Sequence, residues 1–482
     1  MNYIILYYFT YRLSRGIIGK AVKKAVAALL ILLKKVIMEQ QSERKKRKLN
    51  SFQWIIIGFL AALLAGAVLL TLPISSKSGE FTPFCEALFT STSAICVTGL
   101  VVRDTATHWS WFGQAVILLQ IQMGGLGVIT IAMSLIALAR GRITLKQQTS
   151  MQDAFSAPEI GSVSSLLKFI LIVTFSVELI GALAMMPAFC RDFGAKGVWM
   201  SLFHAVSAFC NAGFDLMGTQ EAPYQSLTAY AADPLVNVTV MCLIVFGGIG
   251  FLTLSDIRAN GFHVRKYKMQ TKLILILVPV LILIPALVFF FAEYADLPMG
   301  ERVLYSLFQS VTTRTAGFNT TDLSAMSGAS QAMMIFLMLV GASPASTAGG
   351  MKITTLAVLF LNAFASVRRR DCPVAFGRRI SDGNVKTAST ILLMYLCLFL
   401  TGGVAISWIE SLPVGACLFE TASALGTVGL TLGITPSLSL ASQIILILFM
   451  CFGRVGGLTL FYATFSENGN HAKYPLEGVV VG

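Results

Sequence analysis

The sequence predicts an all-α polytopic membrane protein, with four tandem helix–pore-loop–helix repeats around one central pore. Hydrophobic residues make up 56% of the 482 residues and charged residues only 12%, with a mean hydropathy of +0.76. A soluble domain carries about 25% charged residues. The net charge of +13 would also suit a nucleic-acid-binding protein. The charges lie in the loops between apolar segments, however, which is the pattern of membrane orientation, so we expect no nucleic-acid partner.

The pore loops are predicted from a repeated pattern that is clearest in Ser306–Leu323. A short apolar run there breaks into a Thr-rich segment that ends at Gly317, and the break contains no good helix former. Irregular backbone is tolerated at membrane depth only where it is buried in protein or lines water, and its free carbonyls can replace the water around a cation. The same pattern recurs in three other segments, Phe81–Leu100, Val198–Phe214 and Val414–Leu430, whose terminal glycines are Gly99, Gly213 and Gly429. The near-constant interval between the glycines predicts an internal repeat, and the alternative is chance similarity among apolar, Gly-rich segments.

The N-terminal segment, residues 1–50, is basic and partly apolar. Its apolar run Ala25–Leu33 is too short to span a bilayer, which needs about 20 residues, and lysines flank it. We therefore expect a cytoplasmic amphipathic helix that lies on the membrane surface. A signal peptide is the rival interpretation, but no small-residue cleavage site follows the run. Met38 is an alternative start of the chain.

Eight spans follow, two in each repeat, and the repeats are assigned to residues 51–148, 149–268, 269–384 and 385–482. The predicted spans are Trp54–Leu72, Trp109–Ala139, Leu166–Phe189, Pro234–Leu254, Leu273–Phe291, Ala332–Phe364, Thr387–Ile409 and Ala441–Phe465. Lys and Arg are abundant in every connection between repeats and scattered in the segments that hold the pore loops. The positive-inside rule therefore places both termini in the cytoplasm and predicts that all four pore loops enter from outside.

The second span of each repeat contains clustered glycines, which allow close helix packing or bends. In the third repeat this span is interrupted between Gly341 and Lys352 by small, polar and Pro residues. Such a segment does not remain a regular helix in mid-membrane. We expect a loop below the filter that acts as a gate, and a kinked helix with a packing role is the alternative. The residues assigned to the gate are Gly341, Ser343, Pro344, Ser346, Gly349, Gly350, Lys352 and Arg454.

Arg454 lies near the middle of the last span, where a charge costs about 2.5–3.5 kcal/mol on insertion scales. We expect it to face the pore beneath the filter, where it sets a barrier to cations or hydrogen-bonds the loop of the third repeat. The alternative is an Arg that is satisfied by helix-end carbonyls and has no role in conduction. Arg314 is expected to point away from the filter and to brace its loop by donating hydrogen bonds to the backbone. Glu178 is either a buried structural acid or an ion ligand, and the depth of Lys352 stays open.

Other motifs exclude common chemistries. Glu86, Glu301 and Glu420 fall near the start of three pore helices, where the helix dipole favours acids. The four His residues share no ligand spacing, and the nine Cys residues have no regular spacing and lie mostly in apolar segments, which indicates reduced core residues. Without a Ser-His-Asp, Walker or dinucleotide fingerprint, we expect neither an enzyme nor a cofactor bound by this chain.

From about residue 50 to its end, the chain resembles the Trk/Ktr/HKT superfamily of potassium transporters, and within it the bacterial Ktr membrane subunit. The most specific part is TTRTAGFNT at 312–320, with Asp322 soon after, and the four filter glycines, GASPASTAGGMK and Arg454 add to it. The resemblance implies four pseudo-equivalent units around one pore. It also implies K⁺ uptake, with Na⁺ as an activator, across the plasma (inner) membrane of a bacterium. Its implied partners are membrane lipid, a second copy of the chain in a homodimer, and a cytosolic ring of RCK-type nucleotide-binding regulatory subunits that gates the loop 341–352.

The resemblance also implies which residues bind K⁺ in the filter, namely those at and just before the four glycines. These residues are Val97, Thr98 and Gly99, Asn211, Ala212 and Gly213, Thr315, Ala316 and Gly317, and Thr427, Val428 and Gly429. Gly99 favours K⁺, because plant relatives that favour Na⁺ have Ser at the first glycine. Three of the loops depart from the TVGYG pattern of potassium channels, so fewer tight ion sites are expected.

Two rival functions stay open at this point. An ion-coupled secondary symporter of K⁺ with Na⁺ or H⁺ would need repeats that rock around a midplane site, which four repeats of the same direction do not suit. A receptor or sensor with a closed, inactive pore is the other rival, and flux assays separate all three.

Overall fold

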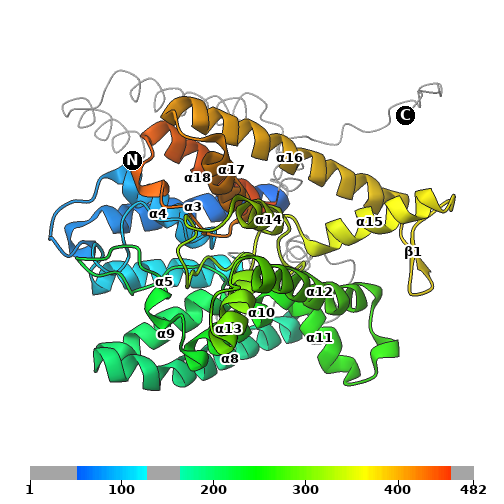
Figure 1. The fold of residues 1–482 in the computed structure, drawn as a ribbon, viewed down its shortest axis with the longest axis horizontal. Coiled ribbons are helices and arrows are strands. Elements are labelled where there is room, and N and C mark those ends of the chain that lie inside the picture. The colour runs from blue at the N-terminus through cyan, green and yellow to red at the C-terminus, as the bar shows by residue number, and fades with distance from the viewer. Residues whose placement is uncertain (1–50, 128–162, 457–482) are drawn as a thin grey trace, which may run out of the picture. The chain divides into compact units, whose positions relative to one another are not determined.

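The computed structural model describes residues 51–127 and 163–456. The predicted N-terminal amphipathic helix, the basic connection expected after the second span and the inner end of the last span lie outside these residues. The described residues are mostly helical, as the all-α prediction requires (Figure 1). They also contain one small antiparallel hairpin of β1 (Val374–Ala375) and β2 (Arg378–Arg379).

The helices fall into four groups with a common order: a long apolar helix, a short pore helix, a loop and a second helix. The first group is α3 (Ser51–Thr71), α4 (Phe84–Ile95) and α5 (Trp111–Leu126). The second group is α8 (Val163–Phe193), α9 (Lys196–Phe209), α10 (Pro234–Ile249) and α11 (Phe251–Asn260). The third group is α12 (Met269–Ala292), α13 (Met299–Thr312), α14 (Gly328–Leu339) and α15 (Ile353–Val367). The fourth group is α16 (Asp382–Glu410), α17 (Val414–Gly426) and α18 (Leu440–Val455).

Local sequence explains where many of these helices begin. Three pore helices start directly after a proline, which has its backbone angle φ already set for a helix start and lacks an N–H that a helix interior would need; these residues are Pro83, Pro298 and Pro413. Three of the second helices follow a Ser or Asp whose side-chain oxygen accepts from N–H groups of the first turn; these residues are Ser110, Asp233 and Ser327. The fourth, α18, follows Ser439, whose side chain makes no such bond.

The second helices break off where the sequence analysis expected continuous spans. α5, α10 and α18 are each followed by a glycine with positive φ, and these are Gly127 at +85°, Gly250 at +93° and Gly456 at +87°. Beyond Gly250 the chain turns by 87° into α11. The clustered glycines therefore break these helices, because glycine alone adopts such angles without steric cost.

Among the described residues, three helices are long and apolar enough to cross a membrane, or four if α10 and α11 count as one span. The three are Ser165–Phe193, Met269–Ala292 and Asp382–Glu410. The expectation of a continuous span is wrong for Pro234–Leu254, which breaks at Gly250, whereas the interruption predicted within Ala332–Phe364 is present between α14 and α15. In both cases glycine and small residues outweigh the hydropathy of the segment.

The four groups close into a ring, because the second helix of each group contacts the pore helix of the next. α5 contacts α9, α10 contacts α13, α14 contacts α17, and α18 contacts α4. Each pore helix carries a fully buried phenylalanine, and these are Phe89, Phe203, Phe308 and Phe419. The ring therefore encloses the four pore helices and the irregular segments that follow them.

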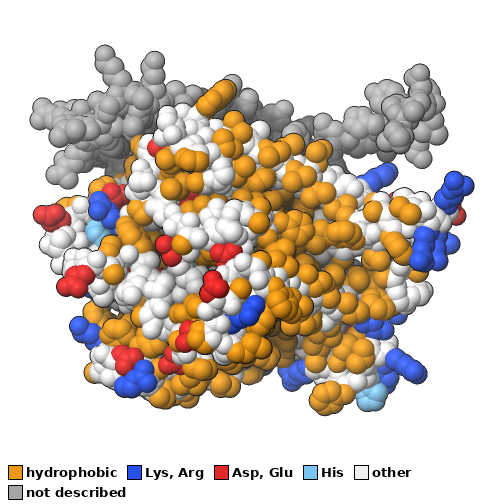
Figure 2. Space-filling view, in the orientation of Figure 1, with side chains coloured by type: hydrophobic (Ala, Val, Ile, Leu, Met, Phe, Trp, Pro, Cys, Tyr) orange, Lys and Arg blue, Asp and Glu red, His pale blue; other side chains and the backbone are white. Residues whose placement is uncertain are grey.

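The outer surface is apolar over the long helices. Figure 2 shows a broad band of hydrophobic side chains across α12 and α16. Large hydrophobic side chains that are exposed on these two helices include Leu283, Phe291 and Leu400. Lys and Arg gather at the end formed by α11, α15 and the hairpin, whereas most acidic side chains in this view lie towards the other end. A contiguous exposed apolar surface of this kind marks contact with a membrane.

Candidate functional site

Gly99, Gly213, Gly317 and Gly429 meet in one ring, in the order of the chain. A Cβ atom built on Gly99 would lie 3.1 Å from the Cα of Gly213, and one built on Gly213 would lie 2.8 Å from the Cα of Gly317. The corresponding distances are 3.3 Å from Gly317 to Gly429 and 3.0 Å from Gly429 back to Gly99. These approaches leave no room for a side chain unless the neighbouring backbone shifts, and the positive φ of all four residues also suits glycine.

The four filter segments share an unusual backbone conformation. The residue two positions before each glycine has a positive φ; these residues are Val97 at +57°, Asn211 at +58°, Thr315 at +71° and Thr427 at +52°. Such angles cost a residue other than glycine about 1–3 kcal/mol, and they persist only where the surrounding structure holds them. In the first and fourth segments a serine helps to hold it, because Ser93 Oγ accepts from the N–H of Gly99 and Ser423 Oγ from that of Gly429, each at 3.0 Å.

Carbonyl oxygens surround this ring, and side-chain oxygens without a partner occur in the same segments of the described structure. The carbonyl oxygens of Thr98, Ala212, Ala316 and Val428 lie against the glycine of the neighbouring segment. Four side-chain oxygens of the filter segments are buried without a hydrogen-bond partner in the described structure: Thr98 Oγ1, Asn211 Oδ1, Thr315 Oγ1 and Thr427 Oγ1. An orphaned buried oxygen costs about 1–3 kcal/mol, and in a native site it calls for a bound ion or water.

The interruption of the third-repeat span is a loop, as predicted, and it lies against the filter. Its base is closed by the Gly341 N–H, which donates to the Met351 carbonyl at 2.7 Å. A Cβ atom on Gly349 would collide with Thr427 Oγ1, and one on Gly350 would lie 2.9 Å from the Gly426 carbonyl oxygen. The loop is therefore in direct contact with the fourth filter segment.

The broken second helices hold this loop in place. The last carbonyls of a helix have no partner inside the helix, and the loop supplies their missing donors. Ser343 N–H donates to the Gly248 carbonyl at 3.1 Å, and Gly350 N–H donates to that of Gly453 at 3.2 Å. In return, the Phe251 N–H at the start of α11 donates to the Ala345 carbonyl at 2.8 Å.

Thr347 joins the loop to the second filter segment. Its hydroxyl accepts from Asn211 Nδ2 at 2.8 Å and donates to the Phe209 carbonyl at 2.9 Å, while its N–H donates to the Gly247 carbonyl at 3.2 Å. Thr347 lies in the predicted loop but is not among the predicted gate residues, because a Thr within a run of small residues gives no signal of a long-range partner.

Arg454 makes the contacts of both interpretations that the sequence left open, with the loop and with helix-end carbonyls. Its guanidinium donates to the Thr347 carbonyl of the loop, and also to the carbonyls of Gly124 and Gly125 at the end of α5, the latter at 3.2 Å. The C-terminal end of a helix carries partial negative charge, which favours a cation there. Arg454 therefore links the loop to the broken second helix of the first repeat.

The other predicted gate residues lie within the loop, with different contacts. Lys352 Nζ donates to the Ala348 carbonyl at 2.8 Å, so its charge stays at the base of the loop. Pro344 lies against Gly250 at the break of α10, through its carbonyl oxygen. The hydroxyls of Ser343 and Ser346 are buried without partners in the described structure.

Glu178 lies behind the second filter segment. It is 3% exposed, and its carboxylate accepts from Gln122 Nε2 at 3.3 Å and from Cys210 Sγ at 3.9 Å. Cys210 directly precedes the filter residue Asn211. The side chain of Glu178 therefore contacts Gln122 and Cys210, which lie beside the second filter segment, rather than the glycine ring.

The explanation offered for Glu420 is wrong. Glu86 and Glu301 do lie in the first turns of α4 and α13, but Glu420 is fully buried in the middle of α17. It accepts from Thr435 Oγ1 at 2.6 Å and from the Leu432 N–H at 3.2 Å. Glu420 thus fixes the chain that leaves the fourth filter segment, which a local helix-start argument does not reveal.

Comparison with known proteins gives a consistent result. Residues 18–472 match the model of the TrkH family, which is described as a cation transport protein. The potassium/sodium uptake protein NtpJ of Enterococcus hirae is 38% identical over 450 residues, covering 90% of this chain and 98% of NtpJ. The Ktr system potassium uptake protein B of Bacillus subtilis is 38% identical over 437 residues, covering 89% and 96%. Among solved structures, the potassium transporter TrkH of Vibrio parahaemolyticus shares the fold, with 19% identity, a TM-score of 0.67 and coverage of 87% and 86%.

Proposed function

The chain belongs to the TrkH family of cation transport proteins, and we propose that it takes up K⁺ through the ring of its four filter glycines. It is a multi-pass membrane protein and a transporter rather than an enzyme. The observation that carries the proposal is the closed ring from Gly99 through Gly213 and Gly317 to Gly429. Its relatives are named as uptake proteins for potassium, or for potassium and sodium.

K⁺ selection is assigned to the main-chain oxygens at the ring, because carbonyls can replace the hydration shell of a cation. The carbonyls of Thr98, Ala212, Ala316 and Val428 are the first candidates, since they lie against the glycines. The orphaned side-chain oxygens of Asn211, Thr315 and Thr427 are further candidates. The C-terminal ends of the pore helices precede these segments and add partial negative charge.

The loop 341–352 together with Arg454 is proposed as the gate. The contact of Gly349 with Thr427 and the bond between Thr347 and Asn211 support this, because they join the loop to two filter segments. The charge of Arg454, held at the loop by the Thr347 carbonyl, would also repel a cation that leaves the filter. Opening then requires the loop to leave the carbonyls of Gly248 and Gly453.

The assembly and orientation are proposed as the family resemblance implies. The chain forms a homodimer in a bacterial plasma membrane, is activated by Na⁺, and is controlled by a cytosolic ring of nucleotide-binding subunits. The name of the Ktr system protein supports a multi-component system. The gathering of Lys and Arg around α11, α15 and the hairpin supports a cytoplasmic position for that end (Figure 2).

Rubidium uptake in a strain without its own K⁺ transporters tests the proposal. Gly317→Asp adds a charged side chain whose Cβ would lie only 3.3 Å from the Cα of Gly429. We therefore expect rubidium uptake to fall to the level of cells without the protein. Gly300→Asp is the matched control, because no atom lies within 4 Å of a Cβ at that position in the first turn of α13. If the Gly317 variant reaches the membrane and still carries rubidium like the Gly300 variant, the filter assignment fails.

Ion-coupled symport is the second candidate, and Glu178 is the observation that favours it. The side chain is a buried acid beside Cys210, next to the filter residue Asn211. If the protein is a proton-coupled symporter, K⁺ accumulation depends on the proton gradient, and Glu178→Gln abolishes this dependence. If the protein is a pore, K⁺ flows down its own electrochemical gradient both in the unmodified protein and in the Glu178→Gln variant.

A further inference from the structure

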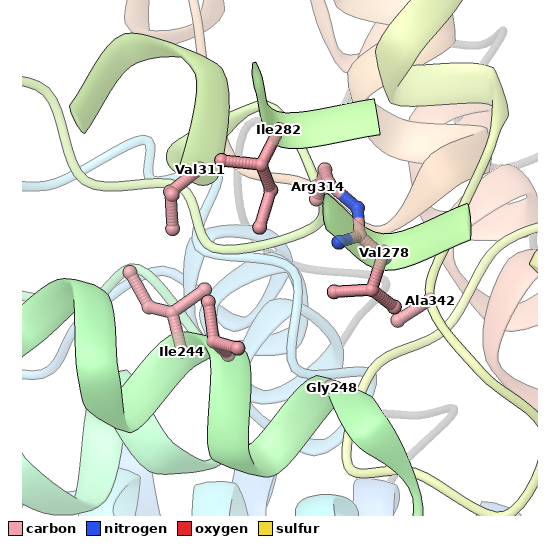
Figure 3. Close-up of a pocket in the computed structure, with 8 residues that line it drawn as sticks. Ile244, Gly248, Val278, Ile282, Val311, Arg314 and Ala342 are labelled. Carbon is pink, nitrogen blue, oxygen red and sulfur yellow. The ribbon is translucent and has the colours of Figure 1, made fainter. Parts of the chain in front are cut away.

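Arg314 is a buried residue whose side chain contributes to neither the proposed filter nor the proposed gate. It lies in the third filter segment, and its side chain borders a cavity between α10, α12 and α13 (Figure 3). The other residues that line this cavity are Ile244, Val245, Gly248, Val278, Ile282, Val311 and Ala342. The sequence predicts that Arg314 donates hydrogen bonds to the backbone. Instead, its Nε is buried without a partner, and the described residues offer its guanidinium no hydrogen bond.

The charge of Arg314 also has no ion-pair partner among the described residues. The residue is only 7% exposed, and the ion pairs within the described ranges are Arg103 with Glu86 and Arg191 with Asp192. A guanidinium keeps its proton in proteins, so it cannot escape burial by becoming neutral. A buried charge without a partner carries a large desolvation penalty. The site therefore requires a counter-charge that the described chain does not provide.

The cavity is sized for a small occupant. Its volume of about 10 Å³ is enough for one water-sized molecule or ion. The side chains around Arg314 are aliphatic (Figure 3). A water molecule needs two to four polar partners, and it would leave the charge in place. A single anion removes the charge and can accept the charge-assisted hydrogen bonds that the guanidinium has to give.

We propose that one small monovalent anion, of the size of chloride, binds beside the Arg314 guanidinium in this cavity. Bound there, it holds the third filter segment against α10 and α12, because all three contribute to its cavity. The anion also screens Arg314 from the cations of the neighbouring filter; this last step alone rests on the proposed function. The site itself is independent of the cation that the ring carries.

Bromide locates the site directly, because it substitutes for chloride and scatters anomalously. Crystals of the purified full chain grown in potassium bromide should give an anomalous peak within hydrogen-bond distance of the Arg314 guanidinium. An absent peak at Arg314, or density there that belongs to water or lipid, overturns the proposal.

Thermal unfolding gives a second readout that does not involve transport. At equal ionic strength, chloride and bromide should raise the unfolding midpoint above that in potassium gluconate, because a ligand that binds only the folded state stabilises it. Arg314→Gln should abolish the difference, whereas Arg314→Lys keeps the charge and retains part of it.

Val278→Ile keeps the test decisive if the Arg314 variants do not fold. It adds one methyl group to the cavity wall and should weaken the apparent halide affinity about tenfold, a loss of about 1.4 kcal/mol. Val280→Ile on the same helix is the matched control, because Val280 is exposed, and it should respond like the unmodified protein. Equal halide responses in all four variants would show that the anion acts elsewhere, and the proposal would be wrong.

Discussion

At the residue scale, Thr347 and Asn211 show how a filter and a gate can be coupled. The two residues are 136 positions apart in the chain, and their side chains form one buried hydrogen bond of 2.8 Å. Thr347 also supplies the carbonyl that Arg454 contacts. Moving the loop therefore removes a partner from Asn211 and from the partly buried charge of Arg454 at the same time.

Thr347→Val tests this coupling. The variant loses the hydrogen bonds of the hydroxyl with Asn211 and Phe209. If their loss costs about 1 kcal/mol net, the equilibrium between the bound and the displaced loop should shift about fivefold towards the displaced loop. We expect higher rubidium flux without a regulatory partner. Thr390→Val, at an exposed position on α16, is the control and should leave the flux unchanged.

A double variant separates coupling from simple disruption. Asn211→Leu combined with Thr347→Val should change the flux by less than the sum of the two single effects, because both remove the same bond. Additive effects would contradict the coupling.

His108 predicts a pH dependence in the connection that follows the first filter segment. Burial, together with the nearby charge of Arg103, lowers the pKa of His108 below its ordinary value of 6.5, and its Nε2 pairs with Thr82 Oγ1 at 3.0 Å. The unfolded chain takes up this proton at a higher pH than the folded chain, so stability falls as the pH drops below about 6.5. His108→Gln should flatten this part of the thermal-unfolding profile between pH 7.5 and 5.5. His263→Gln, at an exposed position, should keep the slope of the unmodified protein.

At the scale of elements, the third and fourth repeats share a device that the sequence analysis missed. Glu293, directly after α12, accepts from the N–H of Ser327 at 3.0 Å and from Ser330 Oγ at 2.5 Å. Glu410, at the end of α16, accepts in the same way from Ser439 N–H at 2.9 Å and from Ser442 Oγ at 2.5 Å. In both repeats, an acid at the end of the first helix therefore completes the N-terminal cap of the second.

Glu410→Gln should destabilise the fourth repeat by about 1.5–3 kcal/mol, the value of hydrogen bonds to a charged group. The cause is that the free N–H groups at the start of α18 lose their charged acceptor. A lower thermal midpoint checks this, with Glu80→Gln in an exposed outer position as the control. The same loss in both variants would contradict a specific cap.

At the scale of the whole molecule, the proposed cation site would couple cation binding to the stability of all four repeats. Each repeat contributes one glycine and its neighbouring carbonyl oxygen to the ring, so a cation bound there would be a ligand that only the folded chain can hold. At a concentration 100 times its dissociation constant, such a ligand adds about 2.7 kcal/mol of stability.

Replacing K⁺ by a large organic cation should therefore lower the thermal midpoint of the purified protein. Gly317→Asp should lose this K⁺ dependence, and Gly300→Asp should keep it. A midpoint that is the same in K⁺ and in the organic cation would be inconsistent with K⁺ binding in the ring.

The amino-acid sequence alone was sufficient for the class of the protein, the pore-loop pattern with its four glycines, and the interruption of the third-repeat span. These features depend on local properties of the sequence: its composition, its hydropathy and the spacing of Gly and Ser/Thr. The family was predicted from the resemblance of the motifs, and the comparisons confirmed it.

Only the tertiary structure decided how these pieces act on one another. Residues that are distant in the chain meet in the glycine ring, at the cavity beside Arg314 and in the hydrogen bonds of Thr347, Glu420 and Arg454. Arg454 and Gly124, for example, are 330 positions apart. The structure also shows where α5, α10 and α18 end. No local pattern encodes such pairs, because the end of a helix leaves its last carbonyls free but does not specify which donor binds them. The donor is determined only when the four repeats pack around one centre.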